Sequence, residues 1–123
     1  MQAVAETHAF RRAAAEAGMR ESEVDCLVTL LAENPALGDP IPGTGGCRKL
    51  RLPMPGKGKS GGYRVVTFFS GETLPVFLLT VFAKGERSDL SYAERNRLGA
   101  LTKAIVSEYR ARVARSSIRG PQK

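Results

Sequence analysis

Hydrophobic side chains recur at helical spacing along the first third of the chain. The two stripes are Phe10, Ala13, Ala14 and Ala17, and then Val24, Leu27, Val28 and Leu31. Because residues at i, i+3, i+4 and i+7 share one face of a helix, these stripes predict helices over residues 7–17 and 22–33. Gly18 ends the first helix, and Ser22 caps the second, with Asp25 three positions further on.

Further along, the hydrophobic period changes from helical to alternating. Residues 35–46 are rich in proline and glycine and predict a loop. Residues 48–52 alternate between basic and aliphatic side chains, as in a half-buried strand, and residues 63–69 are mostly β-branched or aromatic. Residues 76–82 are apolar on both faces, which is typical of a strand inside a sheet. Residues 2–6 are compatible with a short edge strand.

The last predicted element is a helix over residues 92–112. Ser91 and Glu94 have the spacing of a capping box at its start. Its expected sheet-facing stripe is Leu98, Leu101 and Ile105. Short turns join successive strands, so we expect a small, twisted, mainly antiparallel sheet of three to four strands. With two helices before this sheet and one after it, the predicted fold class is α+β.

The length of 123 residues suits one domain with one hydrophobic core. We expect this domain to span residues 1–115 and the basic residues 116–123 to form a disordered tail. No apolar run approaches the roughly 20 residues that a membrane-spanning helix needs. Residues 1–6 also lack the basic start of a secretory signal. These features predict a cytoplasmic protein without a membrane association.

Two cysteines and one histidine leave little scope for metal or disulfide chemistry. Cys26 has apolar neighbours at helical spacing and is expected in the core, and its pairing with Cys47 has weak support. His8 is the single histidine, so the chain has no cysteine and histidine cluster that would bind zinc. We therefore expect no metal and no cofactor.

The net charge of +7 is distributed unevenly along the chain. Residues 1–40 hold three basic and seven acidic side chains. Residues 41–87 hold eight basic and two acidic side chains, and residues 88–123 hold eight basic and three acidic ones. The last two thirds are therefore basic, which suits a polyanion such as nucleic acid. On charge alone, an ordinary solvated surface explains this excess of basic residues as well as a nucleic-acid partner does.

The first candidate site is a basic hairpin over residues 47–64. It contains six basic residues and no acidic one, namely Arg48, Lys49, Arg51, Lys57, Lys59 and Arg64. Lys49 and Arg51 are two positions apart, so they project from one face of the strand while its leucines pack on the other. A cation on a packed strand is held in place, as a phosphate site requires. A solvated hairpin tip is the alternative interpretation.

Arg64 stands inside an otherwise apolar strand, where a charge is costly unless it is paired or exposed at a cleft. It is either the partner of a carboxylate such as Glu72 or Glu86, or a functional cation. Since the chain has no phosphate-binding loop and no Ser/His/Asp set, any RNA cleavage must rely on lysine and arginine. Arginine can stabilise the extra negative charge of a pentacoordinate phosphate.

A third candidate is the segment that follows the last core strand, where loops often carry function. It contains Lys84 and Arg87. Lys84 either holds or protonates a phosphate, or forms a salt bridge with Asp89 or Glu94.

Three segments resemble the HigB-like branch of the RelE toxin superfamily. They are Ile41-Pro42-Gly43-Thr44-Gly45-Gly46 with Arg48-Lys49-Leu50-Arg51, then Gly61-Gly62-Tyr63-Arg64-Val65-Val66, and then Phe82-Ala83-Lys84-Gly85-Glu86 with Asp89-Leu90-Ser91. The likeness spans about residues 4–106. It implies a small twisted antiparallel sheet with helices packed on one side.

The resemblance also implies an activity and its residues. Members of this family are ribosome-dependent endoribonucleases that cut mRNA in the A site, with attack of the 2′-hydroxyl on the adjacent phosphate. By position, Lys49 and Arg51 match the basic strand pair of the catalytic site. Arg64 matches the transition-state arginine, and Lys84 matches the basic residue after the last core strand. The residues expected to bind RNA or the ribosome are Arg48, Lys57, Lys59, Arg87 and Tyr92, the last by base stacking.

The family further implies a helix-turn-helix antitoxin that binds and blocks the toxin. The other expected partners are mRNA on the ribosome and ribosomal RNA. Two alternatives stay open: a non-enzymatic RNA-binding or ribosome-binding module, and a catalytically degenerate partner of a helix-turn-helix regulator. The second rests on Gly85, which stands where RelE has an arginine.

Overall fold

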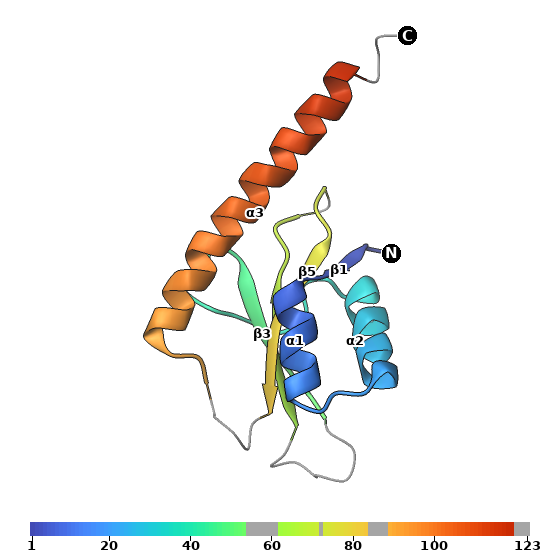
Figure 1. Cartoon of the computed structure of the whole chain (residues 1–123), viewed down its shortest axis with the longest axis vertical. Helices are drawn as coiled ribbons and strands as arrows, with labels where there is room; N and C mark the ends of the chain where they lie inside the picture. Colours follow the sequence, from blue (N-terminus) through green and yellow to red (C-terminus); the bar gives the residue numbers. More distant parts are fainter. Residues whose placement is uncertain (54–61, 72, 84–88, 120–123) are drawn as a thin grey trace.

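The computed structural model describes residues 1–53, 62–71, 73–83 and 89–119, without the side chains of residues 116–119. The elements follow in the order β1 (Val4–Glu6), α1 (His8–Glu16), α2 (Glu21–Glu33), β2 (Asp39–Pro40), β3 (Cys47–Leu52), β4 (Tyr63–Phe68), β5 (Val76–Ala83) and α3 (Tyr92–Arg119). All of these strands form one sheet, in the order β1-β5-β4-β3-β2. The predicted α+β class is confirmed (Figure 1).

The sheet is mainly antiparallel, as predicted. Strands β2, β3, β4 and β5 pair antiparallel with their neighbours, and β1 alone pairs parallel, with β5. β5 therefore lies inside the sheet, as its two apolar faces indicate. The sheet has five strands rather than three to four. The edge strand β1 forms, and β2 arises within the predicted loop because its two residues pair with Arg48 and Lys49.

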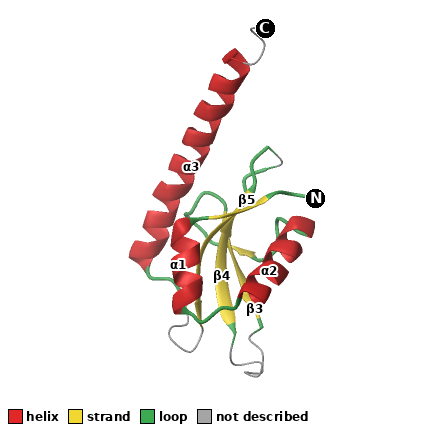
Figure 2. Ribbon diagram, turned by 45° about the vertical axis from the view of Figure 1, so that its right-hand side comes forward, coloured by secondary structure: helices red, strands yellow, loops and turns green. Residues whose placement is uncertain are grey.

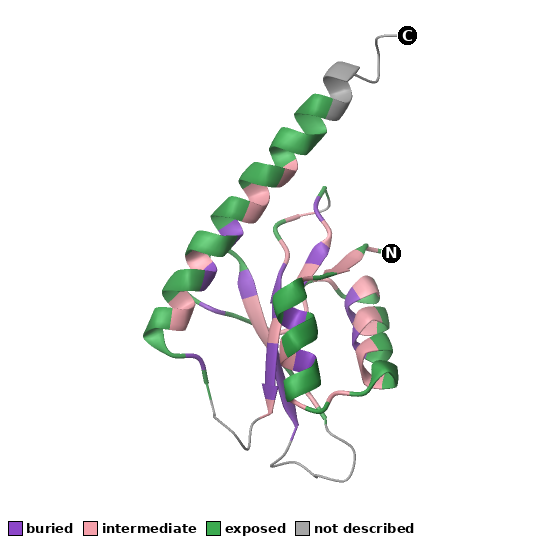
Figure 3. Ribbon diagram, in the orientation of Figure 1, coloured by how far each residue is buried: buried purple, intermediate pink, exposed green. Residues whose placement is uncertain are grey.

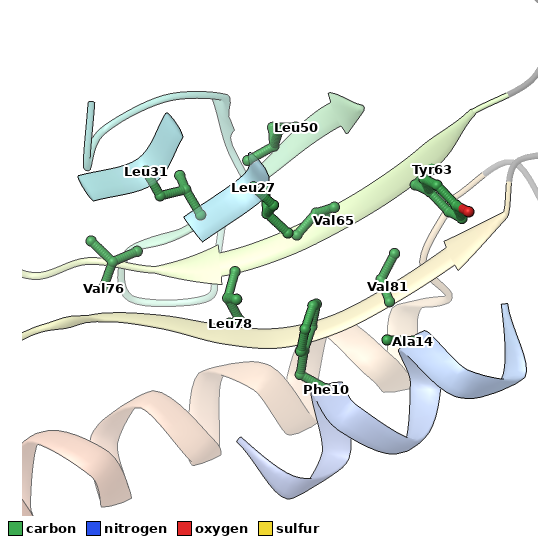
Figure 4. Packing of buried hydrophobic residues seen from close by; sticks show 10 residues of the cluster. All are labelled: Phe10, Ala14, Leu27, Leu31, Leu50, Tyr63, Val65, Val76, Leu78 and Val81. Carbon is green, nitrogen blue, oxygen red and sulfur yellow. The ribbon is translucent and has the colours of Figure 1, made fainter. Parts of the chain in front are cut away.

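Helices cover both faces of the sheet, in contrast to the one-sided arrangement that the resemblance implies. α1 and α2 cross in front of one face (Figure 2), and their core includes Phe10, Leu27, Val65 and Leu78 (Figure 4). The opposite core, beneath α3, contains Val66 and Leu98. Val65 and Val66 belong to opposite cores because successive side chains of a strand point to opposite faces. Every side chain of β4 is buried, so both faces of this strand need a cover.

The N-terminal helices begin where local hydrogen bonds fix them. Thr7 Oγ1 accepts a hydrogen bond from the backbone N–H of Phe10 at 3.1 Å and donates one to Leu78 O at 2.8 Å. These two bonds cap α1 and tie its start to β5. At α2, the backbone N–H of Arg20 donates to Glu23 Oε1 at 2.8 Å. α2 thus starts one residue earlier than predicted, and Ser22 lies within the helix instead of capping it.

The prediction that Cys26 belongs to the core is wrong, because this side chain is exposed. The buried residues of α2 are Leu27 and Leu31. One residue corresponds to a rotation of about 100° around a helix axis, so the position before Leu27 turns away from the sheet.

α3 begins with the predicted capping box. The backbone N–H of Ser91 donates to Glu94 Oε1 at 2.8 Å, and Ser91 Oγ accepts from the N–H of Glu94 at 3.1 Å. Leu98 is buried, but Leu101 is 42% exposed, so its assignment to the sheet-facing stripe is wrong. The helix extends to Arg119 instead of ending at residue 112, and its C-terminal part projects past the sheet with exposed side chains (Figure 3). Residues 116–119 of the expected tail are thus helical, and residues 120–123 lie outside the described part.

A buried threonine pair fastens α3 to the loop before β3. Thr102 Oγ1 lies 2.8 Å from Thr44 O and 3.0 Å from Gly99 O, and its hydroxyl donates a hydrogen bond shared by these two carbonyl oxygens. Thr44 Oγ1 donates to Ile41 O at 2.6 Å and accepts from the backbone N–H of Cys47 at 3.2 Å. The loop that leads into β3 is therefore held by its own threonine and by α3.

We expect Thr102→Val to lower the free energy of unfolding by about 1–2 kcal/mol, because the buried carbonyl of Thr44 loses its donor. Urea denaturation measures this change. The matched control is Thr29→Val at an exposed position of α2, which should change the stability by less than about 0.5 kcal/mol. Equal stability of the two variants would show that the threonine pair does not stabilise the docking of α3.

Candidate functional site

The register of β3 and β4 brings three cations to one face of the sheet. Arg51 lies directly opposite Arg64, and Lys49 lies opposite Val66. Directly opposed residues of an antiparallel pair point to the same face, with Cβ atoms about 4.5–5.5 Å apart. Val66 belongs to the core beneath α3, so these cations lie on the α3 side of the sheet. We call Lys49, Arg51 and Arg64 the basic face.

Arg64 is the most unusual member of the basic face. It is 8% exposed, and its Nη1 is buried without a hydrogen-bond acceptor in the described part of the chain. Glu72 and Glu86, the carboxylates that the sequence offered as partners, lie outside that part. A buried donor without an acceptor costs about 1–3 kcal/mol, and the opposed Arg51 adds like-charge repulsion. A cation kept at such a cost is typical of a site for an anionic ligand.

Lys49 contacts a carboxylate instead of standing free. Its Nζ lies 2.8 Å from Asp89 Oδ1, and the two side chains are 30% and 56% exposed. Asp89 Oδ1 also accepts the backbone N–H of Leu90 at 2.7 Å. The hydrogen bond from Lys49, followed by that from Leu90, holds the pKa of Asp89 below its ordinary value. Lys84, for which the sequence offered Asp89 or Glu94 as a partner, lies outside the described residues, so that pairing stays a prediction.

Arg95 of α3 is a site residue that the sequence analysis did not single out. It is half-buried, and its Nε is buried without an acceptor among the described residues. Its charge is close enough to contribute to the lowered pKa of Asp89, after the two hydrogen bonds. The sequence feature that could have identified it is its position three residues before Leu98, on the same helix face. In the sequence it is simply one of several arginines in a basic helix.

Of the remaining predicted residues, the structure describes Arg48 and Tyr92. Arg48 faces the other side of the sheet, since side chains alternate along β3, and its Nη1 donates to Gly38 O at 3.1 Å. Tyr92, the first residue of α3, is 76% exposed. The other four, Lys57, Lys59, Lys84 and Arg87, lie outside the described residues, as does Gly85.

Other features of the described chain offer no competing site. An open groove of about 440 Å³ lies between α3 and the end of β4, and its lining residues include Phe68 and Arg110 but no member of the basic face. No group of three or more metal-ligating side chains occurs among residues 1–53, 62–71, 73–83 and 89–115. Within the same ranges, no helix is long and apolar enough to cross a membrane.

A comparison with protein families shows which family the chain belongs to. The family model described as the RelE toxin of the RelE/RelB toxin–antitoxin system matches residues 3–119. The chain belongs to the RelE toxin family. As a RelE-family toxin, it is expected to act with an antitoxin, because the family is defined by two-component systems. The basic face, Asp89 and Arg95 all lie within the matched residues.

The ion pair between Lys49 and Asp89 makes a small, pH-dependent contribution to the stability of this RelE-family toxin. A carboxylate whose pKa is lowered in the folded state stabilises the fold above its unfolded pKa of about 4, and this contribution is lost as the pH falls through the lower folded pKa. Because the pair is well exposed, its contribution is under about 1 kcal/mol. We expect Asp89→Asn to lower stability by this amount at pH 7.

Urea denaturation between pH 7 and pH 2 measures this effect. The difference between wild type and Asp89→Asn should shrink toward zero below pH 4. Asp25→Asn, which removes an exposed carboxylate of α2, is the matched control for the loss of one negative charge. A constant difference from pH 7 to pH 2 would contradict the assignment.

Proposed function

We propose that this RelE-family toxin is a ribosome-dependent mRNA endoribonuclease that inhibits translation. The observation that carries the proposal is Arg64, a nearly buried guanidinium with no described acceptor that lies directly opposite Arg51. Two opposed arginines repel each other, and a phosphodiester between them removes the repulsion. A guanidinium also offers a planar fork of donors that matches the oxygens of a phosphate.

The basic face suits the charge that develops during RNA cleavage. Attack of a 2′-hydroxyl on the adjacent phosphorus gives a pentacoordinate transition state with extra negative charge. Donors fixed in advance stabilise such charge best, and Arg64 is fixed because β4 is paired on both sides, by β3 and β5. Lys49 contacts a carboxylate, so it is suited to hold negative charge and not to remove a proton.

The proton transfers need groups beyond the basic face. His8, the single histidine, begins α1, which covers the opposite side of the sheet. We assign to Lys84 the role of holding or protonating the reacting phosphate. Lys84 follows β5 in the sequence, two residues after Phe82, which pairs with Arg64. The role of Lys84 rests on this sequence position and on the family resemblance.

The partners in this proposal follow from the activity. They are mRNA on the ribosome, ribosomal RNA and a helix-turn-helix antitoxin, and ribosome dependence places the toxin in the cytoplasm. Lys57, Lys59 and Arg87 would grip the RNA backbone, and the exposed ring of Tyr92 is free to stack on a base. The proposal does not extend to Arg48, whose guanidinium bonds Gly38 O on the other face of the sheet.

We expect Arg64→Ala to reduce mRNA cleavage on translating ribosomes about a hundredfold to a thousandfold, the usual effect of removing one donor to a charged transition state. Primer extension on the mRNA measures the cleavage. The variant should stay folded, because the lost Nη1 makes no described hydrogen bond. Arg64→Met, which keeps the aliphatic volume, should behave in the same way if the charge is what matters.

Arg12→Ala is the matched control. It removes one arginine from an exposed position of α1, on the other side of the sheet, and should leave cleavage within about twofold of wild type. If Arg64→Ala cleaves as well as Arg12→Ala, Arg64 is not the catalytic group. If wild type binds ribosomes and cleaves nothing, the non-enzymatic binding module is the correct description.

A further inference from the structure

Arg95 belongs to α3, the helix that packs on the side of the sheet where the basic face lies. The capping box of Ser91 and Glu94 starts α3, and the backbone N–H of Arg95 makes an early helical hydrogen bond, to Ser91 O at 3.0 Å. Leu98, three residues on, is packed in the core with Val66 and Phe82. Residues three apart share a helix face, so Arg95 lies on the sheet-facing side of α3. Its neighbour Arg97 is exposed to solvent.

The surroundings of Arg95 repeat the pattern seen at Arg64. Its Nε is buried without a described acceptor, as is Nη1 of Arg64, and these are the two arginine nitrogens with this property among the described residues. Arg95 also acts electrostatically on Asp89, which contacts Lys49. Arg95 and Lys49 thus both act on the charge of one carboxylate, and Lys49 also contacts it. In the described chain, the four cations at this location share a single ion pair, that of Lys49 with Asp89.

An excess of positive charge with two unsatisfied guanidinium donors is unfavourable in the absence of an anion. Lys49 and Arg64 are diagonal neighbours across β3 and β4, about 7–8 Å apart at their Cβ atoms. Arg95 belongs to α3, which packs on the same side of the sheet through Leu98, so the sheet and the helix both supply cations to this side of the molecule. The arrangement suits consecutive phosphates of one strand.

We propose that Arg95 is a fourth cation of the RNA site, which binds the phosphate next to the one that Arg64 contacts. This inference rests on the proposed function, since it names a further residue for the same ligand. It also makes RNA binding depend on α3, because Arg95 is positioned only while Leu98 and Thr102 hold the helix against the sheet and its preceding loop.

The test compares Arg95→Ala with Arg97→Ala, which removes the same charge from the same helix at an exposed position. The probe is a single-stranded RNA about ten nucleotides long, titrated at several salt concentrations. Arg95→Ala should weaken binding about tenfold to a hundredfold and reduce the slope of log affinity against log salt by about 0.7, the value of one lost phosphate contact. Arg97→Ala should change the affinity by less than about twofold. Arg95→Lys should recover the slope but only part of the affinity.

Two outcomes would overturn the inference. In the first, Arg95→Ala and Arg97→Ala give the same affinity and the same salt slope. In the second, Arg95→Ala lowers the midpoint of thermal unfolding by more than about 4 °C while the salt slope stays that of wild type, which would indicate a purely structural role.

The cleavage assay separates this inference from the proposed function. If wild type binds the RNA but cleaves no mRNA on ribosomes, the proposed function fails, and the salt slopes still decide the role of Arg95. If Arg64→Ala loses cleavage and Arg95→Ala keeps the wild-type slope, the proposed function holds and the inference about Arg95 fails.

Discussion

Burial of β4 on both faces is the constraint on which the rest of the structure depends. This strand pairs with β3 and β5 and has no exposed residue. Its two faces require two separate hydrophobic covers, which α1 and α2 supply on one side and α3 on the other. Arg64 is the second residue of this strand, so its side chain extends from a backbone that is paired on both sides. Catalytic donors benefit from such rigidity, because they need not reorganise as charge develops.

The position of α3 depends on few contacts, and these contacts also shape the site. Thr102 bonds Thr44 O, and a Cβ on Gly99 would lie 3.0 Å from Gly43 O, so helix and loop approach each other closely. Gly99 is thus a position where the absence of a side chain permits the packing. The same loop leads directly into β3, which carries Lys49 and Arg51 of the basic face. The docking of α3 and the placement of Lys49 and Arg51 are therefore parts of one arrangement.

The sequence predicts those features that follow from periodicity. The helices, the three main strands and the shared face of Lys49 and Arg51 are predicted, because a period of 3.6 or 2 fixes the direction of side chains. The alignment of Arg64 with Arg51 depends on strand register, and a slip of one residue would turn Arg64 to the other face. No local pattern specifies that register. The two-residue strand β2 has no period at all, and its backbone pairs because β3 is already in place.

Arg95 and Cys26 show the same limit on helices. Cys26 is adjacent to a buried residue and Arg95 lies within a helical turn of one. The side chain of Arg95 nevertheless points inward, whereas that of Cys26 points outward. The difference lies in tertiary packing, since α3 leans on the sheet along Leu98 and Thr102 and α2 along Leu27 and Leu31. The composition of α3 also prevents the sequence from singling out Arg95, because the helix carries exposed arginines that cannot be told apart from it by sequence. In the structure, its partial burial, its Nε without a described acceptor and its effect on Asp89 distinguish it.

The layered fold separates charge across the sheet. Residues 1–40, which contain α1 and α2, hold seven acidic and three basic side chains, while α3 and the basic face lie on the opposite side. Among the described residues, acidic side chains are therefore concentrated on one side of the sheet and basic ones on the other. The field of a polyanion exerts a torque on such a charge distribution, which turns the α3 side toward the approaching phosphates before contact. Orientation of this kind raises the rate of productive encounters at low ionic strength and leaves the bound state unchanged.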